Sequence, residues 1–223
     1  MIQHFQPISV FKKDPYNKIL AFPKVKDSEI EKRIVELKKL GVTHVSFTGP
    51  LRIEKCNILG KGYVGMVLLA KKEKEIFALK IRRTDSPRKN MTNEAKLLSI
   101  ANKIGIGPKF IKNSKNFLIM EFIDGEKIID WAKKSKIKSK DLRSVINNVL
   151  RECYLLDNAG LDHGELSTID KHVIIGKNGN TIIDFESSST KRKSSNVSAA
   201  IQAIFIGTGL AKIIRKKIKI PRK

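Results

Sequence analysis

Three glycines at a fixed spacing, Gly60, Gly62 and Gly65, stand between two strand-like apolar runs. Such a pattern binds dinucleotides when it opens a helix and an acidic residue follows about twenty positions later. Asp85 lies near that distance, but the glycines are followed by the apolar run 66–70 and a charged turn. The sequence therefore predicts a glycine loop bent between two antiparallel strands. It contains no phosphate loop of the GxxxxGK[ST] type.

A lysine ends the following apolar strand. Lys80 closes the run Ala78-Leu79-Lys80, and a predicted helix at 90–103 offers Glu94 as a carboxylate partner. A lysine held by a glutamate can present a fixed positive charge to phosphates. The alternatives are a surface lysine on an edge strand and a glutamate paired with a lysine of its own helix. Val67, on the strand that follows the glycines, is a further predicted nucleotide-binding residue.

The apolar strand 118–123 leads into the polar turn Asp124-Gly125. The backbone groups of Glu121 and Ile123 are candidates for holding an adenine ring between two lobes. A core strand that simply ends in a turn is the alternative.

Acidic residues gather around a second predicted hairpin, whose turn contains Gly179. One group lies in the segment 162–170, and the other lies in Ile183-Asp184-Phe185-Glu186. Carboxylates brought to one end of a hairpin form an oxygen-rich site suited to Mg²⁺ with substrate phosphates. Aspartate and glutamate are also common turn and cap residues, which is the alternative.

In this order and spacing, these elements resemble a protein kinase over about residues 55–190. The run His163-Gly164-Glu165-Leu166-Ser167 is similar to the His-Gly-Asp-Leu run of minimal, atypical kinases. That group includes the RIO family, the small kinase subunit of the KEOPS tRNA-modification complex, and archaeal predicted serine/threonine kinases. The resemblance implies an α+β, protein-kinase-like two-lobed fold with a minimal C-terminal lobe. It also implies ATP, with Mg²⁺ or Mn²⁺, as cofactors.

The resemblance also assigns roles to residues. The glycines would cover the phosphates, Lys80 and Glu94 would form an ion pair, and Asp184 would hold the metal. Glu165 stands where the group has its catalytic aspartate, and Asp170 stands where it has a metal-binding asparagine. The expected catalytic residues are Glu165, Lys80 and Asp184, and the expected metal ligands are Asp170 and Asp184. The expected ATP-binding residues are Gly60, Gly62, Gly65, Val67, Lys80, Glu94, Glu121 and Ile123.

The departures from the pattern leave the activity open. The Glu165 carboxylate sits one methylene further out than an aspartate, so it either orients an acceptor hydroxyl poorly or binds metal instead. Asp162 is a second candidate for the base. Glu186 replaces the glycine of Asp-Phe-Gly, and only 39 residues follow Asp184. The chain is expected to be an atypical serine/threonine kinase, autophosphorylating or ATPase-like, or else a pseudokinase that binds ATP as a scaffold. The hydroxyl residues Ser187–Thr190 and Ser194–Ser195 are either phosphate acceptors in cis or part of a flexible, solvated loop.

Three parts are expected along the chain. Residues 1–50 form an N-terminal helix–strand extension packed on the kinase lobe, residues 51–123 form the N-lobe, and residues 124–223 form a reduced C-lobe with a basic tail. Residues 1–26 are predicted to be irregular or loosely docked. A helix then starts with a capping box, Ser28 and Glu31, and stops at Gly41. A last helix is expected at 197–217.

The net charge of +23 favours partners that carry phosphate, or reflects the lysine-rich composition of heat-adapted proteins. Seven of the residues in Lys212–Lys223 are basic, so this tail either contacts RNA or a ribonucleoprotein, or ends a solvated helix.

Cys56 and Cys153 are far apart, which argues against a disulfide. With no apolar run of about 18 residues and no signal-like start, we expect a cytoplasmic protein without a membrane contact and with an unidentified protein acceptor.

Overall fold

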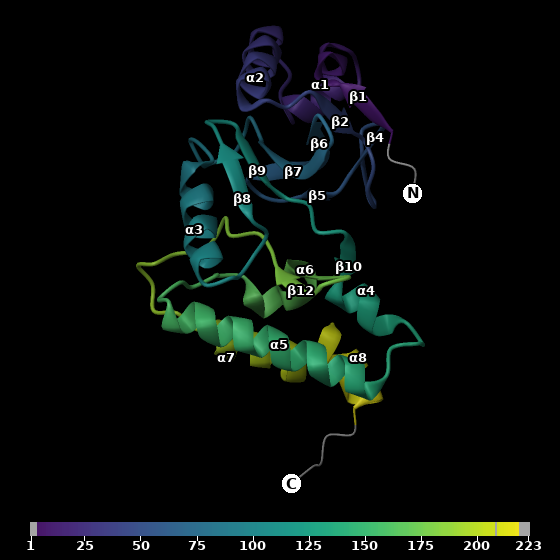
Figure 1. Ribbon diagram of the computed structural model, residues 1–223, viewed down its shortest axis with the longest axis vertical. Coiled ribbons are helices and arrows are strands. Elements are labelled where there is room, and N and C mark those ends of the chain that lie inside the picture. Colours follow the sequence, from purple (N-terminus) through teal and green to yellow (C-terminus); the bar gives the residue numbers. More distant parts are fainter. Residues whose placement is uncertain (1–3, 208, 219–223) are drawn as a thin grey trace. The chain divides into compact units, whose positions relative to one another are not determined.

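The computed structural model describes residues 4–207 and 209–218. The chain forms two compact units (Figure 1). Unit 1 contains residues 1–95 and 109–122, and unit 2 contains residues 96–108 and 123–223. Both units combine helices with antiparallel sheets, which confirms the predicted α+β class.

Unit 1 is built on one antiparallel sheet with the strand order β1-β2-β6-β7-β9-β8, and β5 pairs with β6. A separate hairpin, β3–β4, precedes the glycine loop, and its turn contains Glu54 with φ 52°. The strands of unit 1 are β1 (Phe5–Pro7), β2 (His44–Ser46), β3 (Leu51–Ile53), β4 (Cys56–Ile58), β5 (Gly60–Lys61), β6 (Gly65–Lys72), β7 (Glu75–Arg82), β8 (Phe110–Asn113) and β9 (Phe117–Glu121).

Residues 4–26 form regular elements, so the prediction of an irregular region is wrong for the described part of 1–26. It contains β1, the 3₁₀ helix η1 (Ile8–Lys12) and the helix α1 (Tyr16–Leu20). Phe11, Ile19 and Leu20 are fully buried in the same apolar cluster as Leu79 and Phe117 of the sheet. These elements are too short to show a helical or strand periodicity in the sequence. Burial of their side chains in the core of unit 1 stabilises them.

The helix α2 (Asp27–Leu40) starts one residue before the predicted cap. Its N-cap residue is Lys26, which makes no side-chain capping bond, so the predicted capping box is wrong. The end is as predicted, because Gly41 adopts the left-handed conformation, with φ 86°, that glycine tolerates best. The apolar stripe of α2 is buried, and it comprises Ile30, Ile34, Leu37 and Leu40.

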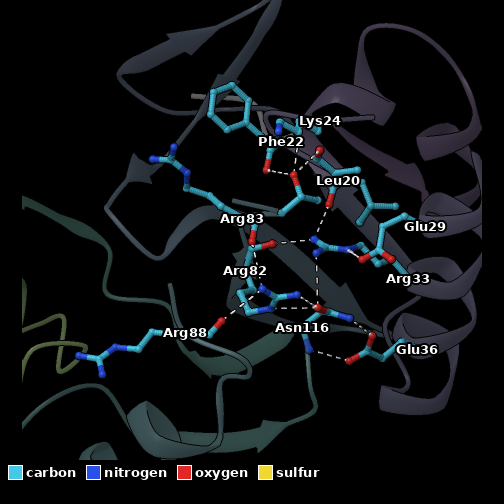
Figure 2. A network of polar contacts seen from close by, with 12 residues as sticks. Leu20, Phe22, Lys24, Glu29, Arg33, Glu36, Arg82, Arg83, Arg88 and Asn116 are labelled. Atoms are coloured by element: carbon cyan, nitrogen blue, oxygen red, sulfur yellow. Dashed lines mark hydrogen bonds and ion pairs between the residues drawn. The ribbon is translucent and has the colours of Figure 1, made fainter. Parts of the chain in front are cut away.

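A fully buried arginine connects α2 to the sheet (Figure 2). The Arg33 guanidinium donates to the backbone oxygens of Leu20 at 2.7 Å and Arg82 at 2.6 Å. It also pairs with Glu29, one turn earlier on α2, at 2.7 Å. A buried charge is tolerated only when its donors are satisfied, and here backbone carbonyls and a carboxylate satisfy them.

The same network continues to the β8–β9 turn. Arg82 donates to the side-chain oxygen of Asn116 at 2.8 and 3.0 Å. The carboxylate of Glu36 accepts two bonds of 2.7 Å from Asn116, one from its backbone and one from its side chain (Figure 2). The extension is thus bonded to β7 and to the β8–β9 turn through charged groups as well as through the apolar core.

Unit 2 contains the three-stranded antiparallel sheet β10-β11-β12 and several helices. The predicted hairpin around Gly179 is confirmed by the pairing of β11 with β12. The strands are β10 (Gly125–Lys127), β11 (Val173–Gly176) and β12 (Gly179–Ile182). The helices are α4 (Ile128–Lys133), α5 (Ser139–Asn158), η2 (Leu166–Thr168), α6 (Ile169–His172), α7 (Asn196–Ile201), the π-helical η3 (Gln202–Ile206) and α8 (Leu210–Lys217). The helix α3 (Thr92–Lys103) belongs to unit 1 up to Ala95 and to unit 2 beyond it.

The predicted last helix is broken into three pieces, α7, η3 and α8. The helical pattern ends at Gly207, and α8 begins after Gly209. Glycine is a poor helix former, which explains an interruption at this point. Among the described residues, no single helix has the length and apolar character needed to cross a bilayer, although Asn196–Ile206 and α8 together pass such a test as a bent pair.

Both cysteines, Cys56 and Cys153, are buried and free. Burial raises the pKa of the Cys153 thiol to about 12, and it also raises the pKa of Cys56. Neither group is therefore a reactive thiolate near neutral pH.

A buried carboxyl on α5 makes the stability of unit 2 sensitive to pH. Burial raises the pKa of Glu152 to about 7, and the side-chain amide of Asn180 opposes the shift. A folded-state pKa above the unfolded value means that stability decreases as the pH rises from about 4.5 to 7. Glu152→Gln imitates the neutral form, so we expect it to stabilise the protein by up to about 3 kcal/mol at pH 8 and to have little effect at pH 4.

Urea unfolding of both proteins at the two pH values measures this effect. Glu126→Gln, a change at a carboxylate that already pairs with Lys134, is the matched control. An equal stabilisation by Glu152→Gln at both pH values would contradict the assignment.

Candidate functional site

The predicted lysine–glutamate pair is present in unit 1. Lys80 on β7 and Glu94 on α3 approach to 2.7 Å, and their side chains are only 3% and 7% exposed. Lys80 lies directly opposite Val67 of β6, so these two side chains share one face of the sheet. A buried ammonium that is held by a carboxylate is a fixed positive charge, unlike the surface lysine of the alternative interpretation.

The glycine loop is a tight turn between β5 and β6, as predicted. The backbone of Gly62 donates to Gly65 at 2.8 Å, and Gly60 pairs with Val67. A Cβ atom on Gly65 would lie 2.7 Å from the backbone oxygen of Ile81, so glycine is required there for β6 to pack against β7. A Cβ atom on Gly60 would meet no atom within 4 Å, so the space beside it is open.

The N-terminal extension reaches this loop through Phe22. The Lys61 ammonium lies 4.5 Å from the centre of the Phe22 ring, and the Arg83 guanidinium lies 5.3 Å from it. Arg83 also donates to the backbone oxygen of Gly62, and its own backbone nitrogen donates to Val64. The extension therefore contacts the segments that position the glycine loop, a connection that sequence reasoning missed.

The predicted adenine-binding residues are Glu121 and Ile123. The backbone nitrogen of Glu121 donates to Lys109 at 2.8 Å, and its carboxylate accepts from the backbone of the same residue. The backbone amide of Glu121 is thus already used by Lys109, and Glu121 also pairs with Phe77 of β7. Ile123 belongs to unit 2 and is half-buried.

In unit 2, the segment that precedes Glu165 is held by buried polar groups. The side chain of Asn196, which is 1% exposed, accepts from the backbone of His163 at 2.8 Å. The ring of His163 is fully buried, and its Nε2–H donates to the carbonyl of Ile183 at 3.0 Å. Burial lowers the pKa of His163 to about 4, so the ring is neutral and acts as a structural donor.

Three ligand-type side chains converge next to this segment. One atom each of Glu165, His172 and Asp184 lies within 4.8 Å of the other two. The Nε2 atom of His172 is 3.5 Å from Oε2 of Glu165, and the hydroxyl of Ser187 donates to Oε1 of Glu165 at 3.0 Å. Two carboxylates and one imidazole are a donor set that fits a divalent cation.

Asp184 is positioned by the residue that follows it. Phe185 is buried, with its ring 5.1 Å from the ring of His163. On its other side, a Cβ atom on Gly107 would come within 2.8 Å of the Phe185 ring, and Gly107 has φ 82°. Asp184 itself has φ 71°, an uncommon value for a residue with a side chain, so the surrounding packing must hold it.

The other predicted acids lie elsewhere. A Cβ atom on Gly209 would be 2.8 Å from Oδ2 of Asp170, so that carboxylate is directed toward Gly209. Asp170 is not part of the ligand group formed by Glu165, His172 and Asp184 among the described residues. Asp162 pairs with Arg192 at 2.7 Å, beside a cavity of about 160 Å³ that both residues line. Its carboxylate is therefore engaged by a guanidinium.

The serine-rich run after Glu186 is bonded to the loop at Glu165 and is not a free solvated loop. Ser187 bonds to Glu165, Ser188 donates to the backbone oxygen of His163, and Ser189 forms an antiparallel bridge with Asp162. The hydroxyls of Ser187 and Ser188, two of the acceptors in cis that the sequence offers, are thus used to position the segment.

Unit 1 of this α+β fold has a glycine loop and a buried lysine–glutamate pair. Unit 2 has an Asp-Phe segment beside a His-Gly-Glu loop. These features define a protein-kinase-like class. Residues 69–199, more than half of the chain, match the model of the RIO domain. The chain therefore belongs to the RIO family of atypical, ATP-binding kinases. It is also similar to an uncharacterised protein of Methanocaldococcus jannaschii, with 32% identity over 101 residues, which are 45% of this chain and 84% of that protein.

The range that matches the RIO domain contains part of the predicted site residues. It includes Lys80, Glu94, Glu165, Asp170 and Asp184. The glycine loop and the N-terminal extension precede it. As a family, RIO proteins use ATP and a divalent metal.

Proposed function

We propose that this protein is an ATP-dependent phosphotransferase, an atypical serine/threonine protein kinase with ATP and Mg²⁺ or Mn²⁺ as cofactors. The observation that supports it best is the buried ion pair of Lys80 with Glu94, at 2.7 Å on the same face of the sheet as Val67. A pair like this orients an ammonium toward phosphate oxygens. Membership in the RIO family supports the same conclusion.

Each unit supplies defined groups for this reaction. Lys80 would bind the phosphates, and Glu94 would hold its ammonium in place. The backbone of Gly60, Gly62 and Gly65 would cover the phosphates, with Val67 beside the base. Asp184 would bind the cation, with Asp170 as the second ligand that the sequence proposes. A bound divalent cation would neutralise phosphate charge as the phosphoryl group leaves.

The proposal predicts that nucleotide affinity depends on the Lys80 ammonium. A charge-assisted hydrogen bond contributes about 1.5–3 kcal/mol, so Lys80→Met should weaken ATP binding by about 10- to 100-fold. Isothermal titration with a non-hydrolysable ATP analogue and Mg²⁺ measures this. Lys74→Met, at an exposed lysine of the β6–β7 turn, is the matched control and should bind as the wild type does.

Because Lys80→Met leaves the Glu94 carboxylate buried, circular dichroism must first show that the variant is folded. Glu94→Gln provides a second test, since it keeps the lysine and removes its charged partner. Wild-type affinity in both variants would contradict the proposed nucleotide site.

One observation favours the pseudokinase alternative. Both oxygens of Glu165 already have neighbours, Ser187 on one side and His172 on the other. A carboxylate engaged in this way is a poor base for an acceptor hydroxyl. If the protein binds ATP without turnover and Glu165→Asp gains activity, the chain is an ATP-binding scaffold whose chemistry was lost at this position.

The basic tail is the proposed contact for RNA, but its described contacts favour a structural role. Arg215 donates to the carbonyls of Phe205 and Gly207. Lys217 donates to the carbonyls of Lys134 and Ile137. These cations are bonded to backbone carbonyls at the ends of helical segments, where positive charge is stabilising. Residues 219–223 of the tail lie outside the described part of the chain.

A further inference from the structure

Glu165, His172 and Asp184 come from three neighbouring segments of unit 2. Glu165 precedes η2, His172 ends α6, and Asp184 follows β12. Their ligand atoms lie within 4.8 Å of one another. A cation at about 2.1 Å from each ligand requires separations of up to about 4.2 Å, so small side-chain movements would complete the coordination.

Contacts with neighbouring residues restrict the side chains of Glu165 and His172. Ser187 bonds to one oxygen of Glu165, which leaves Oε2 facing Nε2 of His172. His172 is about nine-tenths buried, and its ring packs edge-on against His163 at 5.6 Å. Outer groups that fix the orientation of a metal ligand in this way contribute strongly to metal affinity.

The imidazole decides which metal suits the group. Mg²⁺ prefers oxygen ligands in a strict octahedron and retains several waters. An imidazole nitrogen suits Mn²⁺, Fe²⁺, Co²⁺ and Zn²⁺, and two carboxylates beside it fit the same ions. Copper(I) is disfavoured because no sulfur ligand is in the group.

We propose that Glu165, His172 and Asp184 form a three-ligand site for a divalent transition metal, with His172 as the ligand that selects Mn²⁺ or Zn²⁺ over Mg²⁺. The proposal deepens the metal requirement of the proposed function, but it stands on the geometry of unit 2 alone. It assigns Glu165 to the metal and not to a free catalytic base. The remaining coordination positions are open to water or to phosphate oxygens.

The test is calorimetric titration of the metal-free full-length protein with Mn²⁺ alone, Zn²⁺ alone and Mg²⁺ alone, without nucleotide. One site is expected, with Mn²⁺ or Zn²⁺ at least about tenfold tighter than Mg²⁺. His172→Ala should weaken the transition-metal binding by at least about tenfold and leave Mg²⁺ binding unchanged. His4→Ala, at an exposed histidine, is the matched control.

Glu165→Gln is the second variant, because it keeps the size of the side chain if His172→Ala fails to fold. Equal affinity for Mg²⁺ and the transition metals, or binding that neither variant changes, would overturn the proposal. So would the absence of binding, which would leave a simple Glu165–His172 contact. Lys80→Met should bind the metal as the wild type does, so a failure of phosphotransfer and a failure of the metal site are distinguishable.

Discussion

Asp184→Asn is expected to reduce ATP turnover by at least about 10²-fold while the protein remains folded. The variant keeps the shape of the side chain and removes the charge that would bind the cation. Phe185, which is buried against His163 and Gly107, holds the segment in place in both proteins. Steady-state release of phosphate, measured with Mg²⁺ and with Mn²⁺, reports the effect.

Asp130→Asn is the matched control, because it makes the same substitution at an exposed carboxylate of α4 in the same unit. It should leave turnover at the wild-type rate. If Asp184→Asn retained most of the wild-type rate, the reaction would not depend on a cation at this position, and the assignment of the site would be wrong.

Arg33→Met is expected to destabilise unit 1 by about 3–5 kcal/mol. Methionine fills a similar volume, but the carbonyls of Leu20 and Arg82 lose a buried donor and Glu29 loses its partner. Buried polar groups without partners account for most of the cost. Chemical denaturation followed by circular dichroism measures the change, and hydrogen exchange of the β7 amides locates it.

Lys32→Met, on the exposed side of the same helix, is the control and should change the stability by less than about 0.5 kcal/mol. A loss of less than about 1 kcal/mol in Arg33→Met would mean that the apolar core alone attaches the extension to the sheet.

The sequence predicted the parts of the fold that depend on local pattern. The hairpins around Gly62 and Gly179 have turn residues between apolar runs, and both are present. The buried stripe of α2 and its end at Gly41 follow from helical spacing and from the conformational freedom of glycine. Short elements such as α1 show no helical periodicity in the sequence, because tertiary contacts stabilise them.

Candidate site residues were predictable where their spacing matches the family, as for Lys80 and Glu94. His172 was missed because a lone histidine two positions after Asp170 has no pattern of its own. Glu165 and Asp184 lie close to His172 only in the folded chain, where α6 and β12 bring the three residues together. The direction of the Asp170 side chain, toward Gly209, likewise depends on a contact that is distant in sequence.

The measurement that tests the central claim most directly is incubation of the purified protein with γ-labelled ATP and Mg²⁺ or Mn²⁺. Labelled protein and released phosphate are both followed, with Lys80→Met and Asp184→Asn in parallel. We expect label or free phosphate in the wild type and its loss in both variants. Nucleotide binding that depends on Lys80, without any label or phosphate under either metal, would contradict the phosphotransferase and leave an ATP-binding scaffold.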